Sequence, residues 1–169
     1  MANTQLVQML GQGAAAWNAT HNQLDLSNAA LQNMNLSGYD FSGMNLSGAK
    51  LSFANLSGAQ LQGANLSGAN LFNANLTGAN LSGANLHGAE MENAVLGSAN
   101  LRGADLSGAS MFSAHLEQSN LCGANFTNAF LNDAFLNFAD VSGADFGGAN
   151  GQNANITGVN MQLAKRPLV

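Results

Sequence analysis

The stretch "NLSGANLFNANLTGANLSGANL", residues 65–86, places a leucine at every fifth position. The same spacing continues in both directions, and Gly151 alone interrupts a column of Leu, Phe, Met, Val and Ile. Two residues before each member of this column stands almost always an alanine. The unit A-N-L-S-G therefore repeats from residue 24 to residue 163 without insertion or deletion.

A period of five fits neither regular element, because an amphipathic helix needs apolar residues three and four apart and a strand needs strict alternation. Within one unit, however, A-N-L points inward, outward and inward, as a short extended segment does. The following Ser-Gly is typical of a turn, since glycine accepts a positive φ. A straight segment followed by a corner, repeated many times, predicts a coil.

The residues two positions after the central leucine indicate how many sides the coil has. With a period of 20, one corner column from residue 33 to residue 153 never contains glycine, whereas another, from 43 to 143, contains nothing else. We interpret these columns as corners with different turn types. They predict a square coil of 20 residues and about seven coils, stacked at the strand spacing of about 4.8 Å.

The composition restricts the function. Hydrophobic residues make up 46% of the 169-residue chain and charged residues only 8%, against roughly 25% charged in an average protein. The net charge of -5 leaves no basic stripe to meet phosphates. The sequence shows neither a signal peptide nor a membrane span, and the lone Cys122 agrees with a reducing compartment. We therefore expect a soluble, cytoplasmic protein that binds neither nucleic acid nor membrane.

The units "ANLSG", "ADLSG" and "ANLTG" resemble the pentapeptide-repeat family. The resemblance implies an all-β fold, a right-handed quadrilateral parallel β-helix with the central Leu or Phe and the preceding Ala inside the shaft. It also implies a short helical cap at residues 1–23, with Trp17 over the first coil. The β-helix would then cover residues 24–163, and residues 164–169 would form a C-terminal tail.

No pattern in the sequence indicates catalysis. In the predicted register, His87 and His115 lie on opposite faces and His21 precedes the shaft, so they cannot form a metal site. A solid shaft offers no cleft that would desolvate a nucleophile, and Cys122 is one outward residue among many. We predict that the protein is not an enzyme and has no catalytic, cofactor or metal residues.

Large apolar residues at outward positions are the most informative feature, because the core does not need them. We interpret them as a protein-binding surface, since clustered exposed apolar area marks contact sites. The alternative is that their rings fold over the corners and shield the backbone. On one face lie Phe53, Phe72, Phe112 and Phe130, and on the adjoining face lie Phe135 and Phe138.

The sequence leaves three candidate functions. The first is a rigid scaffold that presents the aromatic residues to an unidentified protein partner. The second comes from the resemblance alone: some family members mimic DNA with rows of carboxylates and bind type II topoisomerase, giving quinolone resistance or protection from a gyrase poison. Here the nine acids are scattered over all four faces, which favours the first function. The third, ice binding, would need an aligned threonine array that Thr77, Thr127 and Thr157 do not provide.

The C-terminal end of the shaft needs a cover, because an open coil exposes backbone groups and apolar interior. Either the short tail folds back over the last coil, or two shafts meet end to end across a two-fold axis, as in dimeric members of the family. We favour a homodimer, since it buries both ends at once. The predicted contact residues are Phe146, Met161, Leu163, Leu168 and Val169.

Overall fold

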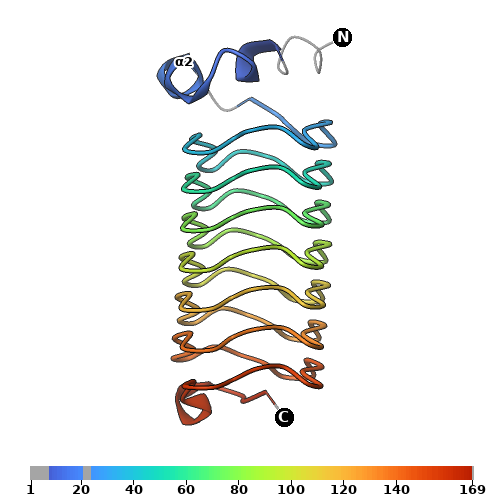
Figure 1. Cartoon of the computed structure of the whole chain (residues 1–169), viewed down its shortest axis with the longest axis vertical. Helices are drawn as coiled ribbons and strands as arrows, with labels where there is room; N and C mark the ends of the chain where they lie inside the picture. The colour runs from blue at the N-terminus through green and yellow to red at the C-terminus, as the bar shows by residue number, and fades with distance from the viewer. Residues whose placement is uncertain (1–7, 21–23, 169) are drawn as a thin grey trace.

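The computed structural model describes residues 8–20 and 24–168 of the chain. From residue 24 onward the backbone forms a stack of similar coils, with the two ends of the chain at opposite ends of the stack (Figure 1). The helix α2, Ala14–Thr20, lies at the N-terminal end, and the 3-10 helix η1, Met161–Leu163, lies at the C-terminal end. The long axis of the molecule is therefore the axis of the shaft.

Parallel β-bridges join residues of neighbouring coils, as in Asp25 to Asn45. Four such bridges, which begin with Asp25, Ala30, Asn35 and Asp40, join each coil to the next, except that three join the last two coils. We name the four resulting columns of bridges the first, second, third and fourth face. The four-sided, 20-residue coil predicted from the repeat is present, although each side is so short that it contributes one isolated bridge and no longer strand.

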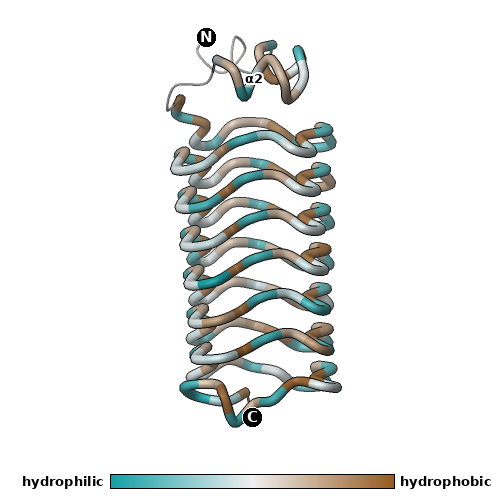
Figure 2. Tube along the Cα trace, turned by 90° about the vertical axis from the view of Figure 1, so that its left-hand side faces the viewer, coloured by the Kyte–Doolittle hydropathy of each residue, from teal (hydrophilic) through white to brown (hydrophobic). Residues whose placement is uncertain are grey.

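The inward columns form one continuous core. Leu66, Ala69 and Leu71 are 0% exposed, and the corresponding residues of the other coils are similarly buried. Figure 2 shows hydrophobic and hydrophilic residues alternating along the coils. Ser119 interrupts the alanine column, and its hydroxyl donates to the carbonyl of Leu116 at 2.7 Å, so it is buried without an unmet hydrogen bond. Each buried leucine contributes about 1.5–3 kcal/mol, which explains how a chain with few charges is stable.

The corners differ from the prediction. The glycine-free column and the glycine-only column share one backbone conformation: φ is 61° at Asn33 and 59° at Phe53, and 65° at Gly43 and 64° at Gly63. The other two corner columns are left-handed as well. The prediction of a distinct turn type at each corner was therefore wrong, because Asn, Asp, Ser, Gln and even Phe adopt the conformation that glycine favours.

Outward asparagines bond both their own turn and the next coil, as Asn65 illustrates. Its Oδ1 accepts from the N–H of Ser67 at 3.2 Å and from Nδ2 of Asn85 at 3.3 Å. Its Nδ2 donates to Oδ1 of Asn45 at 3.2 Å. This local bonding is what makes asparagine suitable at turns. On the first face the N–H two residues after the bridge is bonded in this way in every coil from Asp25 to Asp145.

Aromatic residues connect α2 to the first coil. Trp17 is 1% exposed, and its indole N–H donates to the carbonyl of Asp40 at 2.8 Å. Its ring lies 5.6 Å from that of Phe41, and the hydroxyl of Tyr39 donates to the carbonyl of Leu10 at 2.5 Å. Burial raises the pKa of Tyr39. These contacts cover the apolar interior at the N-terminal end of the shaft.

Candidate interaction surface

The outward phenylalanines lie on the second and third faces. We call Phe53, Phe72, Phe112, Phe130, Phe135 and Phe138 the aromatic edge. Phe72 is half-buried, and the others are exposed, from 36% at Phe135 to 62% at Phe138. The predicted register therefore places all of these rings on the outside of the shaft.

Most rings of the aromatic edge pair with a ring in the neighbouring coil. Phe53 meets Phe72 edge to face at 5.5 Å between ring centroids, and Phe112 stacks on Phe130 at 6.0 Å. Phe135 stacks on His115 at 4.7 Å, and Nδ1 of that histidine lies 2.9 Å from Oε1 of Glu117. Such pairs fix ring orientation and contribute roughly 0.5–1.5 kcal/mol each. The rings therefore present ordered apolar surface to the solvent.

Two of these phenylalanines occupy corners with an unfavourable backbone. The φ angles of Phe53 and Phe138 are 59° and 61°, a region that bulky side chains adopt rarely and at a cost. The ring of Phe138 lies over Gly158 of the next coil, where a Cβ would stand only 2.4 Å from the ring. Packing over a corner, the alternative predicted above, thus applies in part to Phe138, although the residue remains mostly exposed.

The turns around Phe112, Phe130 and Phe135 lack a side-chain hydrogen bond that most turns of the shaft make, as do the turns after Ala30, Lys50 and Gln60. In three consecutive coils of the second and third faces, the bridge position holds residues other than asparagine or aspartate, such as Val95, Phe130 and Phe135. Within the described part of the chain, the N–H groups two residues later donate to no partner. They belong to Glu92, Gly97, Phe112, Glu117, Asn132 and Asn137.

At the C-terminal end, the tail pairs with the last coil. Gly143 N–H donates to Leu163 O at 2.7 Å, and Phe146 N–H donates to Arg166 O at 2.9 Å. Asp145 and Arg166 form a parallel bridge. The tail therefore folds back over the last coil on the first and fourth faces, which is one of the two arrangements predicted for this end.

Two glycines make room for the side chains of the tail. A Cβ on Gly147 would stand 2.3 Å from the guanidinium of Arg166, and one on Gly151 would stand 2.5 Å from Leu168. Leu168 thus occupies the space that Gly151 leaves in the leucine column. Arg166 binds Asp145 through two hydrogen bonds, Nε to Oδ1 at 2.5 Å and NH2 to Oδ2 at 2.6 Å. This pairing lowers the pKa of Asp145.

The predicted dimer residues are therefore not all available. Phe146 is 1% exposed and stacks on Phe126 in the core at 4.9 Å, so it does not form part of an exposed end. Leu163 is 53% exposed, and Met161 and Leu168 are half-buried. Val169 lies outside the described residues. Ile156, at 39% exposure, joins this end although the sequence analysis did not assign it.

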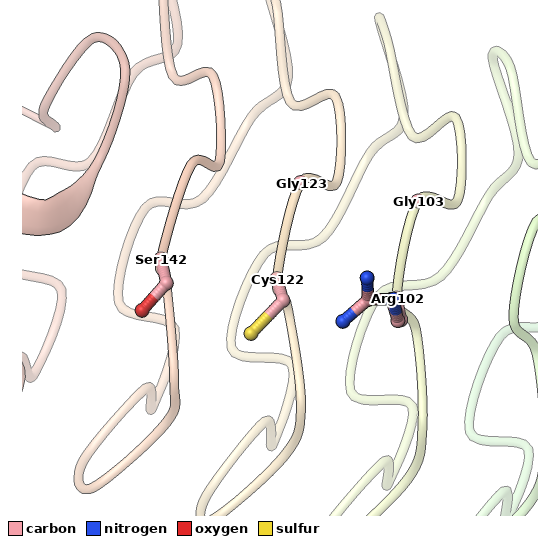
Figure 3. A pocket seen from close by; sticks show the side chains of 5 residues that line it. All are labelled: Arg102, Gly103, Cys122, Gly123 and Ser142. Carbon is pink, nitrogen blue, oxygen red and sulfur yellow. The ribbon is translucent and has the colours of Figure 1, made fainter.

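A shallow hollow of about 400 Å³ lies at the corner between the fourth and first faces, lined by Arg102, Gly103, Cys122, Gly123 and Ser142 (Figure 3). Burial, together with a hydrogen bond to Asp140, raises the pKa of the Cys122 thiol. The pKa of Asp140 is lowered by its hydrogen bonds from Ser142 and Cys122. A raised thiol pKa reduces the thiolate fraction and with it the nucleophilicity, so this hollow lacks the chemistry of an activated cysteine.

The described part of the chain has neither a cluster of metal ligands nor a helix that could span a membrane. There, no group of three or more His, Cys, Asp or Glu side chains is placed to hold a metal ion. No helix among these residues is long and apolar enough to cross a membrane. His87 and His115 lie on the first and third faces, and His21 lies outside the described residues.

Two features of the structure were not predicted: the missing turn hydrogen bonds and the contact of the tail with the last coil. The sequence nevertheless carries an indication of each. The missing turn bonds follow from the absence of asparagine at the bridge positions, once those positions are known to bond their own turns. The contact of the tail was indicated by Gly147 and Gly151, since both replace larger residues of the repeat in one coil. A glycine at a position that is usually filled marks space for a group from elsewhere in the chain.

The chain belongs to the pentapeptide repeat family. The family's model, described as pentapeptide repeats, matches in 8 copies over residues 25–63, 59–97, 89–128, 99–137 and 131–165. No curated protein matches the chain.

Solved structures of pentapeptide repeat proteins are similar to it. One from the thylakoid lumen of Arabidopsis thaliana is 42% identical, with a TM-score of 0.59 over 60% of this chain and 71% of that one. The plasmid-mediated fluoroquinolone resistance protein QnrB1 is 22% identical, with a TM-score of 0.50 over 87% and 73%. HetL, involved in heterocyst differentiation regulation in the cyanobacterium Nostoc, is 22% identical, with a TM-score of 0.43 over 97% and 96%. The similarity to QnrB1 concerns the fold alone.

Proposed function

We propose that this chain is a non-catalytic interaction protein whose rigid β-helical shaft presents the aromatic edge to a protein partner. The observation that carries the proposal is the loss of turn hydrogen bonds beside the exposed rings. A bonded N–H contributes about 0.5–1.5 kcal/mol, and the shaft gives up several in adjacent coils where Phe130 and Phe135 replace asparagine. The exposed part of each ring returns no stability to the isolated shaft, and exposed apolar area of this kind is typical of binding surfaces.

The strained corners support the same function. Phe53 and Phe138 are held at positive φ, at a cost that asparagine or glycine would avoid at the same positions. Neither ring fills the core, since both are more than half exposed. Backbone strain of this kind is found at functional sites, where binding compensates for it.

A capture experiment tests the proposal. The intact chain and a variant with Phe112, Phe130 and Phe135 changed to Ser are used to capture proteins from a lysate of the source organism. A control variant carries alanine at Ser47, Ser67 and Ser82, on the first and fourth faces. We expect a discrete protein to bind the wild type and the control but not the variant. Equal capture by all three, with unchanged circular dichroism, would contradict the proposal.

The DNA-mimic function is the alternative, and it requires rows of carboxylates. The first face comes nearest to such a row, with Asp25, Asp105 and Asp145 among asparagines, but Asp145 is neutralised by Arg166 and Lys165. This pattern supports the interaction protein over the mimic. A gyrase supercoiling assay distinguishes the two functions. If the chain is an interaction protein of another kind, it should neither inhibit gyrase nor protect gyrase from a quinolone at about 10–50 μM protein, a concentration well above the dissociation constants of specific complexes.

We further propose that two copies meet at the C-terminal end. On the second and third faces of the last coil, the N–H groups of Gly151, Asn153 and Ile156 donate to no partner among the described residues. This open edge lies beside exposed Ile156 and Leu163. A second copy related by a two-fold axis would bury both edges at once.

Light scattering tests the dimer. We expect twice the monomer mass at micromolar concentration, and a monomer of 17.3 kDa for Leu163→Asp. Ser82→Asp, at mid-shaft, is the control and should remain dimeric. A wild type of monomer mass would contradict the proposal.

A further inference from the structure

The second face carries a carboxylate between aromatic rings. Phe72, Glu92 and Phe112 occupy equivalent positions in three successive coils, one residue after the buried column. Glu90 stands in the same coil as Glu92, on the other side of buried Met91. Neighbouring coils lie about 4.8 Å apart, so a group that touches Glu92 also lies within reach of both rings.

Hydrogen bonds hold these two carboxylates in place. Oε2 of Glu90 accepts from Nδ2 of Asn70 at 2.6 Å, and Oε1 of Glu92 accepts from the hydroxyl of Ser110. The second oxygen of each carboxylate has no hydrogen-bond partner within the described residues, and no Lys or Arg there pairs with either. Each carboxylate is thus oriented and retains a free acceptor.

The charge around Glu90 and Glu92 is mostly negative, and Lys50 of the same face lies two coils away from Glu90. Between residues 90 and 139 the sequence has one Lys or Arg, Arg102, and it lies on the fourth face. The acids of the second and third faces in this interval are Glu90, Glu92, Glu117 and Asp133. Beside them lies His115, whose Nδ1 is 2.9 Å from Oε1 of Glu117. This combination of rings and unneutralised carboxylates complements a ligand that is both apolar and cationic.

We propose that the partner docks through a segment that carries Lys or Arg between apolar side chains, with one cationic group on Glu92 between Phe72 and Phe112. The proposal rests on the proposed function and specifies its partner. The cation binds the carboxylate by a charge-assisted hydrogen bond and contacts the aromatic faces, while the apolar neighbours cover Phe112 and Phe130. The free N–H groups of the same faces are donors for carbonyls of the docked segment.

The side-chain oxygen of Asn132, which has no hydrogen-bond partner, supports a docked segment that carries hydrogen-bond donors. This Oδ1 is buried and accepts no hydrogen bond, although buried polar atoms are normally bonded. Asn132 follows Phe112 in the same column and is two residues from Phe130. A donor from the docked segment satisfies this oxygen once the amide rotates toward the solvent.

Selection from a displayed library of random peptides tests the proposal on the full-length chain. Selected peptides are then measured for affinity against three variants. The first, Glu90→Gln with Glu92→Gln, removes both charges and keeps the acceptors for Asn70 and Ser110. The second changes Phe112 and Phe130 to Ser, and the control, Asp105→Asn, removes a charge from the first face.

We expect the selected peptides to contain Lys or Arg beside apolar residues and to lose about tenfold or more in affinity with the double glutamine variant. The double serine variant should weaken binding as strongly, and Asp105→Asn should change it less than about twofold. Circular dichroism confirms that each variant is folded.

Two other results overturn the proposal in distinguishable ways. Peptides that need Phe112 and Phe130 but carry no basic residue, and bind the double glutamine variant equally well, refute the cationic partner and leave the proposed function standing. If no selected peptide is sensitive to the double serine variant, the proposed function fails together with this inference.

Discussion

Replacing Phe130 with asparagine and, separately, with alanine distinguishes a binding surface from structural packing. Both changes remove the ring. Only asparagine restores the turn that Asn70 makes on the same face, three coils earlier, where its Oδ1 accepts from the N–H two residues later at 3.2 Å. In the wild type, the corresponding N–H of Asn132 has no partner. The difference between the two variants therefore isolates the missing hydrogen bond.

The magnitudes follow from exposure and contacts. Phe130 is 46% exposed, so its truncation loses about half of the roughly 1.5–3 kcal/mol of a fully buried side chain. Its stacking with Phe112 contributes about 0.5–1.5 kcal/mol more. We expect Phe130→Ala to cost about 2 kcal/mol. Phe130→Asn should cost about 1 kcal/mol, because the restored turn bond returns about 0.5–1.5 kcal/mol.

Denaturant unfolding measures these differences, with Phe126→Ala as the reference for a buried ring. Phe126 is 0% exposed, and its truncation should cost about 3–5 kcal/mol. Binding to peptides selected on the wild type should weaken equally in both Phe130 variants, although their stabilities differ. The reasoning is refuted if Phe130→Ala costs as much as Phe126→Ala, or if asparagine is no more stable than alanine.

Three further changes test the core, the tail and the ion pair. Leu81→Ala should cost about 2–5 kcal/mol, whereas Ser82→Ala should stay within about 0.5 kcal/mol; equal losses in thermal melts would contradict the register. Gly151→Ala and Leu168→Ala should each destabilise the packing of the tail on the last coil, and the double variant should lose less stability than the sum of the two single losses. Hydrogen exchange of the tail amides measures these losses, and strictly additive losses would contradict the contact between Leu168 and Gly151. Arg166 lowers the pKa of Asp145, so this stabilisation is present above about pH 4. It is lost as the pH falls toward 2, and Asp145→Asn should flatten the fall of Tm; an unchanged slope would contradict the role of the pair.

The fold was predictable because one constraint acts on every unit. A residue that fits inside the shaft at Leu66 also fits at Leu71 and Leu76, so the same residue types recur every five positions in the sequence. The corner conformation was not predictable from residue type. Gly63 and Phe53 share it, because the closure of the coil fixes φ and the residue adapts. Tertiary geometry here overrides local preference, and the column analysis reached the correct number of sides from a wrong premise about turn types.

The ends of the shaft were predicted less well, because there the repeat no longer constrains the chain. Gly151 interrupts the leucine column in the sequence, and Leu168 fills this space from the tail. The pairing of Asp145 with Arg166 joins residues 21 positions apart, one more than the period of the shaft. A single added residue shifts the register, and no periodic pattern can indicate that shift.

The shaft provides its own comparison for the surface, since every outward position has equivalents in other coils. Asn65 bonds its own turn and both neighbouring coils at once, so a residue other than asparagine or aspartate at an equivalent site gives up the turn hydrogen bond. On the first face the chain retains these turn bonds throughout. On the third face it gives them up at Val95, His115 and Phe135, and on the second face it gives them up in the same three coils and also after Ala30 and Lys50. This clustering beside exposed rings supports the proposal that the partner binds the second and third faces.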